Sequence, residues 1–327
     1  MRDRLVEETV KLLRQTGFDV SDTCNIRPKS FDVVARRSSI VVLVKVLSNI
    51  DGFDPHTADE MKRLSDHLDA SSLIIGERTR DDEMEESVVY LRHGIPAVSL
   101  KTADDFFRHD LPPLVYMAPG GLYVSLNGDV LSEERKSEEM SLGQVAREIG
   151  VSRRSVSKYE DGMDATVDVA LKLEEIFDKE LTSPIDILSI EETEREDETD
   201  GAEDADIDQN EVGEKERVVF ERLDSAGFRV LPTSKAPFRA VSRTRERDDD
   251  GTTILTGISR YSKTMVKRAK LMSSISDVAG SSTESLYVVE TSERESIDDT
   301  AVLEREELEE IRGSDELLED VYERKTA

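Results

Sequence analysis

The sequence is poor in the residues that several large classes of protein depend on. Its 327 residues include one cysteine, Cys24, four histidines and no tryptophan. A single cysteine excludes an intramolecular disulfide and a cage of thiolate ligands. The histidines are scattered through the chain without the spacing of metal ligands. We therefore expect neither a metal site nor a cofactor.

The chain also lacks a long hydrophobic run. It contains no apolar stretch of about 18 residues, the length from which a membrane-spanning helix is inferred. The N-terminal segment, residues 1–13, has the pattern of a charged amphipathic helix and not that of a signal peptide. These absences predict a cytoplasmic protein without a membrane partner.

Negative charge, in contrast, is abundant. Asp and Glu number 73 against 44 Lys and Arg, which gives a net charge of −29, and only 15 of the basic residues are lysines. Carboxylates are abundant in both terminal parts of the chain and in the region around residues 129–188, so no single acidic tail accounts for the total. This composition is typical of a cytoplasm holding molar salt, where self-repulsion is screened within about 3 Å. It predicts a halophilic protein.

A short stretch near the middle of the chain carries the strongest functional pattern. Val145, Ala146 and Ile149 recur on one face of a predicted helix over residues 144–149. Gly150 follows, where a tight turn between two helices needs a residue that tolerates positive φ. The pattern predicts the first helix and the turn of a helix-turn-helix.

A second predicted helix follows this turn. Ser152 can N-cap a helix over residues 153–160, on which Val156 and Tyr159 point inward. A glycine turn followed by a helix that opens with polar and basic side chains is typical of a helix-turn-helix. The side chains expected outside are those of Arg153, Arg154, Ser157 and Lys158.

Residues 129–188 resemble the Cro-like repressor family, also called the xenobiotic-response-element family of transcription regulators. The resemblance implies that the helix opened by Ser152 enters the major groove and reads bases, while the N-terminal end of the preceding helix contacts phosphates. It implies helices over Asp129–Glu139, Leu142–Glu148, Ser152–Tyr159, Val167–Phe177 and Pro184–Leu188. The candidate DNA-binding residues, in a motif spanning Gly143 to Gly162, are Gln144, Ser152, Arg153, Arg154, Ser155, Ser157 and Lys158.

The motif is locally basic in a strongly acidic chain. Residues 144–158 contain four Lys or Arg against one acidic residue, Glu148. The helix expected before the motif is more acidic than a surface near phosphates normally is, so the basic face is narrow. We expect double-stranded DNA to approach this face and the rest of the surface to repel it.

The first 110 residues are predicted to form an α/β domain, and residues 111–128 a two-stranded ribbon between Leu114–Ala118 and Leu122–Leu126 that acts as a strap more than as a wing. Residues 189–216 contain 14 Asp or Glu and predict a disordered acidic linker. The first expected element of the α/β domain is a helix that ends at Gly17 and carries an apolar stripe of Leu5, Val10, Leu12 and Leu13. The other expected elements are strands over 31–36 and 39–47, a helix over 58–68, a strand over 71–77, a helix over 88–91, a strand over 95–100 and a closing segment over 104–107.

Residues 217–327 are predicted to form a second α/β domain that is a degraded copy of the first. The run from Leu12 to Val20 aligns with the run from Arg222 to Val230, and the order of later apolar runs persists. The other expected equivalences are Phe31 with Phe238, Ile40–Val44 with Thr253–Gly257, Leu73–Glu77 with Leu286–Glu290, and Ala97–Phe106 with Thr300–Leu308.

The α/β domain is similar in element order to the restriction-endonuclease-like nucleases. That resemblance implies a metal-binding Asp at position 32 and a lysine at position 45, but Leu43 stands where a second carboxylate is required. Glu7 or Glu8 would be a poor substitute. In the second copy Arg239 replaces the Asp, and Gly257 or Ile258 falls near the lysine position. We expect both copies to be catalytically inactive, with no catalytic residues and no metal.

Together these patterns predict a sequence-specific DNA-binding transcriptional regulator that is not an enzyme. The order of the parts also resembles a set of archaeal helix-turn-helix transcriptional regulators. The alternative is a DNA-processing protein with an inactive nuclease-like fold that uses the helix-turn-helix for docking, and an antitoxin is a weaker third option. The expected partners are double-stranded DNA and a second copy of the chain, with an unidentified small-molecule effector left open.

Overall fold

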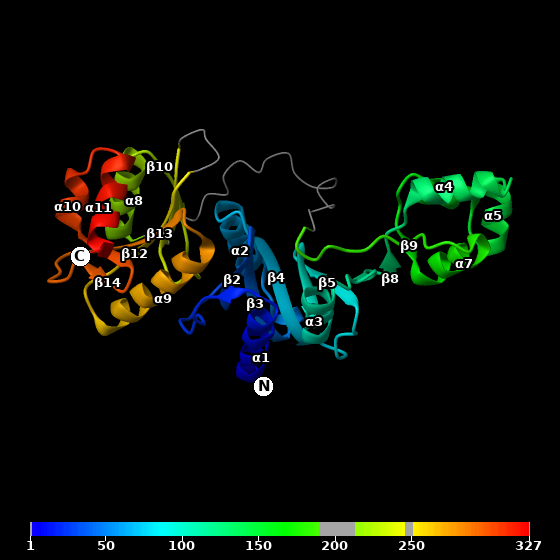
Figure 1. Ribbon diagram of the computed structural model, residues 1–327, viewed down its shortest axis with the longest axis horizontal. Coiled ribbons are helices and arrows are strands. Elements are labelled where there is room, and N and C mark those ends of the chain that lie inside the picture. Colours follow the sequence, from blue (N-terminus) through cyan, green and yellow to red (C-terminus); the bar gives the residue numbers. More distant parts are fainter. Residues whose placement is uncertain (1, 190–212, 246–250, 327) are drawn as a thin grey trace. The chain divides into compact units, whose positions relative to one another are not determined.

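The computed structural model describes residues 2–189, 213–245 and 251–326 of the chain, which divides into two compact units (Figure 1). The first unit comprises Met1–Val46, Phe53–Ser72 and Glu194–Ala327, and the second comprises Leu47–Gly52 and Leu73–Thr193. Most of the predicted acidic linker lies outside the described residues. The remainder of that prediction is wrong from residue 214 onward, because helix α8 (Glu214–Ser225) begins there.

The N-terminal part of the first unit is a helix followed by an antiparallel meander. Helix α1 (Arg2–Gln15) buries Leu5, Leu12 and Leu13, in agreement with the predicted stripe. The meander consists of β1 (Asp19–Val20), β2 (Val33–Arg37) and β3 (Ile40–Asn49), with Val34 opposite Leu43 in the predicted hairpin. A 3₁₀ turn (Ile50–Gly52) and helix α2 (Pro55–His67) follow, and α2 starts earlier than expected because Asp54 caps it ahead of Pro55.

The second unit contains a mixed sheet that continues the α/β pattern. Its strands are β4 (Ser71–Arg78), β5 (Val88–Arg92) and β6 (Ile95–Ser99), and α3 (Leu100–His109) follows them. The helix predicted over 88–91 is wrong, because these residues form β5. A tight turn at His93 and Gly94, both with positive φ, folds β5 back against β6. Two β-branched residues, Val88 and Val89, favour the strand.

The predicted ribbon is part of this sheet. Strand β7 (Val115–Ala118) pairs in parallel with β5, and β8 (Gly121–Val124) pairs with β7 and with β9 (Ala165–Thr166). The sheet therefore runs in the order β4-β6-β5-β7-β8-β9, from the α/β elements to the helical part of the unit. Strand β8 is thus paired on both sides, as expected if the ribbon is a strap that connects neighbouring elements. A projecting wing would have a free edge.

The C-terminal part of the first unit is a second α/β fold with a six-stranded sheet. Its elements after α8 are β10 (Phe228–Pro232), β11 (Ala240–Thr244), β12 (Thr253–Ile258), α9 (Lys263–Ala279), β13 (Thr283–Val289), β14 (Ser296–Ile297), β15 (Thr300–Glu304), α10 (Arg305–Glu310) and α11 (Ser314–Thr326). The strand order is β10-β11-β12-β13-β15-β14, and residues such as Leu223, Phe228 and Leu286 fill the core under α8.

Among the described residues, no helix combines the length and the apolar character that are needed to cross a lipid bilayer.

Candidate nucleic-acid interface

Four helices surround one hydrophobic core in the helical part of the second unit. They are α4 (Gly128–Ser137), α5 (Leu142–Ile149), α6 (Arg153–Glu160) and α7 (Val167–Phe177). The helix α7 has the predicted bounds, whereas α4 is shorter than predicted and α5 and α6 each end one residue later than the family's helices imply. The core consists mainly of Leu131, Val145, Ala146, Ile149, Val156, Tyr159, Ala170, Leu173, Phe177 and Leu181.

The fifth helix expected at Pro184–Leu188 is wrong. This segment is irregular and has a turn at Ile187 and Leu188. Ile185 N–H donates to the Pro113 carbonyl of the ribbon, and Ser183 N–H, just before the segment, donates to the Ser125 carbonyl. The Glu174 carboxylate accepts the N–H groups of Leu181 and Thr182, so the segment is tied to α7 as well. These bonds replace the intrahelical bonds that a helix here would have made.

Helix α5 begins with a capping box. Gln144 N–H donates to the Ser141 hydroxyl over 3.3 Å, and the Gln144 amide oxygen accepts Ser141 N–H over 2.8 Å. The amide N–H₂ of the exposed Gln144 therefore remains as the group that can donate to a phosphate. Gly150 ends the helix with φ 79°, the conformation that the predicted turn requires.

Helix α6 presents the predicted basic face to solvent. Val156 is fully buried and Tyr159 is nearly so, which fixes the rotation of the helix. Arg153, Arg154 and Lys158 are exposed, and within the described part of the chain no carboxylate lies within ion-pair distance of them. Ser157 is half-buried beside them.

Two of the candidate residues are engaged within the helix itself. The Ser152 hydroxyl accepts Ser155 N–H over 3.0 Å, and the two hydroxyls lie 2.9 Å apart. Ser152 is exposed and Ser155 half-buried, so both remain near the N-terminal end of α6. Their geometry indicates that they cap the helix and thereby orient Arg153 and Arg154.

The position of α6 depends on two contacts with α4 that the sequence did not reveal. Arg135 on α4 makes a two-pronged ion pair with Glu160, and one of its bonds measures 3.0 Å. Gly128 lies so close to the C-terminal end of α6 that an added Cβ would be 2.3 Å from the Glu160 carbonyl oxygen. Only glycine fits there, so the glycine at the start of the predicted helix was the available signal.

Cationic side chains surround Asp32, the residue at the metal-binding position of the nuclease-like fold. Asp32 is fully buried, and its carboxylate accepts Val46 N–H over 2.8 Å and pairs with Arg2 at 2.7 Å and Lys29 at 2.6 Å. Leu43 is also fully buried. A divalent metal needs several free oxygen ligands, but both oxygens of Asp32 are engaged and position 43 offers none. The residues present therefore do not fit a metal.

Lys45 lies beside this carboxylate and donates to the Lys29 carbonyl over 2.5 Å. Burial lowers the pKa of the Lys45 ammonium to about 8, although Asp32 raises it. The unfolded chain therefore binds more protons than the folded chain between pH 8 and the ordinary lysine pKa of 10.5. Since stability rises with pH wherever the unfolded state binds more protons, Lys45 should add stability as the pH increases through this window.

We accordingly expect the unfolding free energy of the protein, minus that of a Lys45→Met variant, to increase by at most about 3 kcal/mol across this window. Urea unfolding of both proteins at constant high KCl and stepwise pH measures this difference. A difference that is constant or falls with pH would contradict a depressed lysine pKa.

One other group of the described residues could offer three ligand atoms to a metal. Asp104, Asp105 and His109 on α3 have such atoms within 4.8 Å of one another. The two carboxylates already pair with Arg108 and Lys101, one turn away on the same helix. Exposed acidic groups paired in this way are common on helices, so we assign no site to them.

A surface hollow of about 430 Å³ lies between α1 and the segment that follows β1. Its lining combines Val6 and Val10 with charged side chains such as Lys11, Arg14 and Asp22. Nothing in its lining selects a ligand, so the small-molecule effector stays a prediction.

Two protein families match separate parts of the chain. Residues 2–113 match the family described as the PD-(D/E)XK superfamily domain, and residues 131–183 match the helix-turn-helix family. The first match agrees with the nuclease-like fold around Asp32, and the second covers α5, α6 and α7. No solved structure matches the chain.

Archaeal relatives cover almost the whole length of the chain. A protein of Natronomonas pharaonis is 51% identical over 99% of this chain and 98% of its own, and one of Halobacterium salinarum is 48% identical over 97% and 95%. A protein of Methanosarcina acetivorans is 44% identical over 99% and 98%. Each bears the name "Putative HTH-type transcriptional regulatory protein". The haloarchaeal sources agree with the predicted halophilic composition. The chain belongs to this family of archaeal helix-turn-helix proteins.

Proposed function

We propose that this protein is a sequence-specific DNA-binding transcriptional regulator that reads the major groove with α6. The observation that carries the proposal is the exposed face of Arg153, Arg154 and Lys158, which no carboxylate neutralises within the described chain. The match to the helix-turn-helix family and the names of the relatives support it. Selection of bound sites from a pool of random duplexes, at high KCl, tests it.

The residues of this face have distinct expected roles. An arginine fork fits guanine O6 and N7, so Arg153 and Arg154 are the proposed base readers. Gln144 and the first N–H groups of α5 would contact phosphates and fix the orientation of α6. Because counterion release contributes less to affinity as salt rises, base contacts carry more of the binding free energy in molar salt.

The regulator is proposed to bind as a homodimer. The part of the chain that the structure describes contains one helix-turn-helix, which would read about half a turn of duplex. Proteins with this motif pair on half-sites about 34 Å apart. Sedimentation at high salt measures the oligomeric state. A species of 36.7 kDa with a footprint that lacks two-fold symmetry would reject the homodimer.

We also propose that the two α/β parts arose as copies of one unit. The series α1-β1-β2-β3-α2-β4-β5-β6-α3 has the same order as α8-β10-β11-β12-α9-β13-β14-β15-α10. Both parts begin with an antiparallel meander. In both, two later strands pair in parallel and a short strand pairs antiparallel with the second of them. Unrelated folds rarely share order and pairing direction together.

Contacts between the copies support the same proposal, because equivalent elements exchange equivalent contacts. Strand β2 lies against α9, and β11 lies against α2. Arg36 on β2 reaches Gly280, which follows α9, while Arg243 on β11 pairs at 3.1 Å with Asp69, which follows α2. Phe31 and Phe238 meet with ring centroids 6.5 Å apart. Reciprocal contacts of this kind are those of a two-fold dimer, made here within one chain.

The hairpin registers support an alignment of the nuclease-like positions in the two proposed copies. Val33 lies opposite Val44 and Ala240 opposite Thr256, so Asp32 corresponds to Arg239 and Lys45 to Gly257. An added Cβ at Gly257 would be 2.4 Å from the ring of the buried Tyr287. In the second copy, the ring of Tyr287 therefore fills the space that corresponds to the Lys45 side chain of the first copy.

The ion pair at the aspartate position is also reversed in charge. Arg2 on α1 pairs with Asp32 at 2.7 Å, whereas Glu216 on α8 pairs with Arg239 at 3.0 Å. In both copies an ion pair joins the first helix to the residue just before the second strand. The helix supplies the cation in the first copy and the anion in the second. Neither arrangement leaves carboxylates for a metal, and we propose that both copies are non-catalytic scaffolds.

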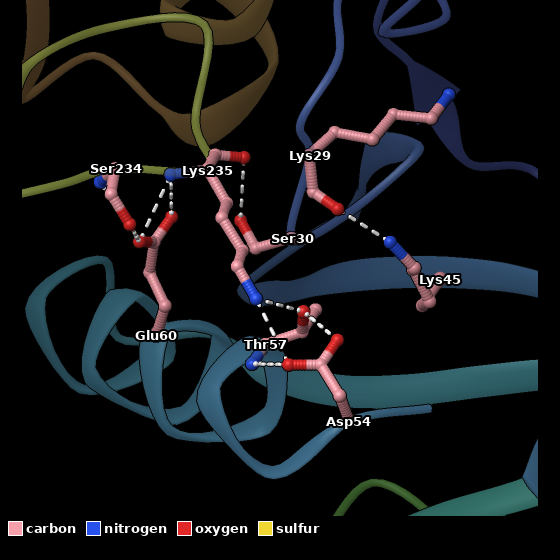
Figure 2. Close-up of polar contacts among 8 residues, drawn as sticks. All are labelled: Lys29, Ser30, Lys45, Asp54, Thr57, Glu60, Ser234 and Lys235. Atoms are coloured by element: carbon pink, nitrogen blue, oxygen red, sulfur yellow. Dashed lines mark hydrogen bonds and ion pairs between the residues drawn. The ribbon is translucent and has the colours of Figure 1, made fainter. Parts of the chain in front are cut away.

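A polar clamp joins the copies (Figure 2). The Glu60 carboxylate on α2, almost fully buried, accepts Ser234 N–H and hydroxyl at 2.9 Å and Lys235 N–H at 2.8 Å. The Lys235 ammonium reaches Asp54 at 2.9 Å, and the Ser30 hydroxyl donates to the Lys235 carbonyl over 3.3 Å. The Ser30 N–H donates to the same carbonyl. Burial raises the pKa of Asp54, but hydrogen bonds from Thr57 and Lys235 outweigh it and hold that pKa well below its ordinary value.

Replacing Glu60 by alanine should destabilise the first unit by about 2–4 kcal/mol, because the donors of Ser234 and Lys235 would stay buried without an acceptor. Asp59→Ala, which removes an exposed carboxylate from the same helix, is the matched control and should change stability by less than about 0.5 kcal/mol. Urea unfolding at high KCl measures both. Equal midpoints for the two variants would contradict the clamp.

The alternative function, a DNA-processing protein, is favoured by one observation. Residues 2–113 match the PD-(D/E)XK superfamily, many of whose sites combine two carboxylates with a lysine. Leu43 and the occupied Asp32 oppose it here. We therefore propose that the chain has no nuclease activity.

A further inference from the structure

A second basic region lies in the C-terminal α/β part, outside the helix-turn-helix. Residues 251–276 contain no Asp or Glu, which makes them the longest stretch of this chain without a carboxylate. The same stretch contains five Lys or Arg, and three of the 15 lysines of the chain fall between positions 263 and 270. The protein has a net charge of −29, but this stretch has a local charge of +5. That exceeds the local charge of +3 over residues 144–158, which include most of α6.

Most of these cations lie on one face of α9, the long helix drawn in orange in Figure 1. Lys263, Lys267 and Lys270 are spaced by four and three residues, so they share one side of the helix. All three are exposed. The opposite side is buried in the core through Met265, Ala269, Met272, Ile275 and Ser276. The lysine face is therefore directed away from the sheet.

The charges on this face are largely unneutralised. Lys263 and Lys267 have no carboxylate within ion-pair distance among the residues that the structure describes. Lys270 pairs with Asp298 at 3.0 Å and Arg260 with Glu290 at 3.5 Å, but these pairs are at least half exposed on the cation side and hold their cations weakly. Tyr261, 44% exposed, adds a hydroxyl donor beside them.

The fold itself does not require these cations. In the proposed first copy the equivalent helix is α2, which with its N-cap carries four carboxylates, at Asp54, Asp59, Glu60 and Asp66, against Lys62 and Arg63. The two helices pack in the same place of the same fold with opposite net charge. Structure therefore does not explain the lysines of α9, whereas a polyanionic ligand does.

We propose that the Lys263–Lys267–Lys270 face of α9 binds the phosphate backbone of duplex DNA, as a second contact that rests on the proposed function of the chain. The three lysines span about 10 Å of helix at 1.5 Å per residue, which corresponds to about three phosphates along one strand at 3.4 Å each. Lysine is a point charge suited to phosphate and carries no planar fork for base edges. This face would therefore add affinity without adding sequence specificity.

The double variant Lys263→Ala/Lys267→Ala tests the proposal, with Lys11→Ala/Lys101→Ala as the control. Each pair removes two exposed lysines and changes the net charge equally, and the control residues lie outside α9 and its ion pairs. Affinity for a mixed-sequence duplex is measured over a range of KCl concentrations in which circular dichroism shows the fold intact. Two lost phosphate contacts should reduce the slope of log K against log salt by about 1.8. The control should keep the wild-type slope.

The outcomes separate this proposal from the proposed function. A wild-type slope in Lys263→Ala/Lys267→Ala overturns the α9 contact, whatever the helix-turn-helix does. Loss of binding to poly-L-glutamate with an unchanged DNA slope also overturns it, because the face would then bind an acidic protein. A third outcome is that Arg153→Ala/Arg154→Ala keeps its sequence preference while Lys263→Ala/Lys267→Ala reduces the slope of log K against log salt. That result would refute base reading by α6 and support the phosphate contact of α9.

Discussion

Replacing Arg153 and Arg154 by alanine should weaken binding to the selected DNA site by about 2–6 kcal/mol in total, or roughly 30-fold to 10⁴-fold. The physical reason is that each arginine fork makes a bidentate contact to a guanine, worth about 1–3 kcal/mol of discrimination. Both side chains are exposed and lack a carboxylate partner within the described chain, so no internal contact is lost with them. Fluorescence anisotropy at fixed, high KCl measures the change.

The matched control is Arg4→Ala/Arg217→Ala, which removes two exposed arginines outside the helix-turn-helix. Their side chains are 77% and 72% exposed, and each pairs with a glutamate one turn away on the same helix. Such pairs contribute little to stability, so this variant isolates the effect of net charge. Selected sites should be preserved in the control and degenerate in Arg153→Ala/Arg154→Ala. Equal affinity and equal sequence preference in the two variants would refute the role of α6.

Replacing Asp32 by alanine should destabilise the protein by about 3–5 kcal/mol, because it removes one partner of a buried charge cluster. Arg2 and Lys29 would lose their common carboxylate, and the buried N–H of Val46 would lose its acceptor. Asp19→Ala, at an exposed site in the same part of the chain, is the control and should be nearly neutral. Urea unfolding at constant KCl compares them, and a neutral Asp32→Ala would contradict a structural role.

The same variant also tests whether the nuclease-like fold is inactive. Neither the natural protein nor Asp32→Ala should cut plasmid or junction DNA in the presence of Mg²⁺, since Leu43 provides no second carboxylate. Cleavage by the natural protein that requires a divalent ion and disappears in a folded Lys45→Ala variant would show instead that the site is catalytic.

The parts of the structure that the sequence predicted well are those set by local patterns. The bounds of α6 and its inward residues Val156 and Tyr159 follow from a cap, a turn glycine and helical spacing within about twenty residues. The strand over Val88–Arg92 was mistaken for a helix because a short apolar run has no clear period. This strand pairs locally with β6 through the turn at His93 and Gly94, but its other partner, β7, lies more than twenty residues later.

Long-range polar contacts were beyond the sequence for the same reason. The donors to Glu60 are 174 and 175 residues away, and Arg135 and Glu160 are separated by 25 residues. The sequence alignment of the two proposed copies differs by one residue at β12 from the alignment that the hairpin registers support. It matched Val44 with Gly257, whereas Val33 lies opposite Val44 and Ala240 lies opposite Thr256, which makes Thr256 the proposed counterpart of Val44. Only the backbone pairing distinguishes these two choices, since both strands are short apolar runs.

The most direct test of the central claim is the genome-wide DNA occupancy of the intact protein in cells at their native salt concentration. We predict discrete peaks that share one sequence motif and that are lost in Arg153→Ala/Arg154→Ala but retained in Arg4→Ala/Arg217→Ala. Occupancy without a shared motif, or peaks that persist unchanged in the α6 variant, would contradict a regulator that reads DNA with this helix.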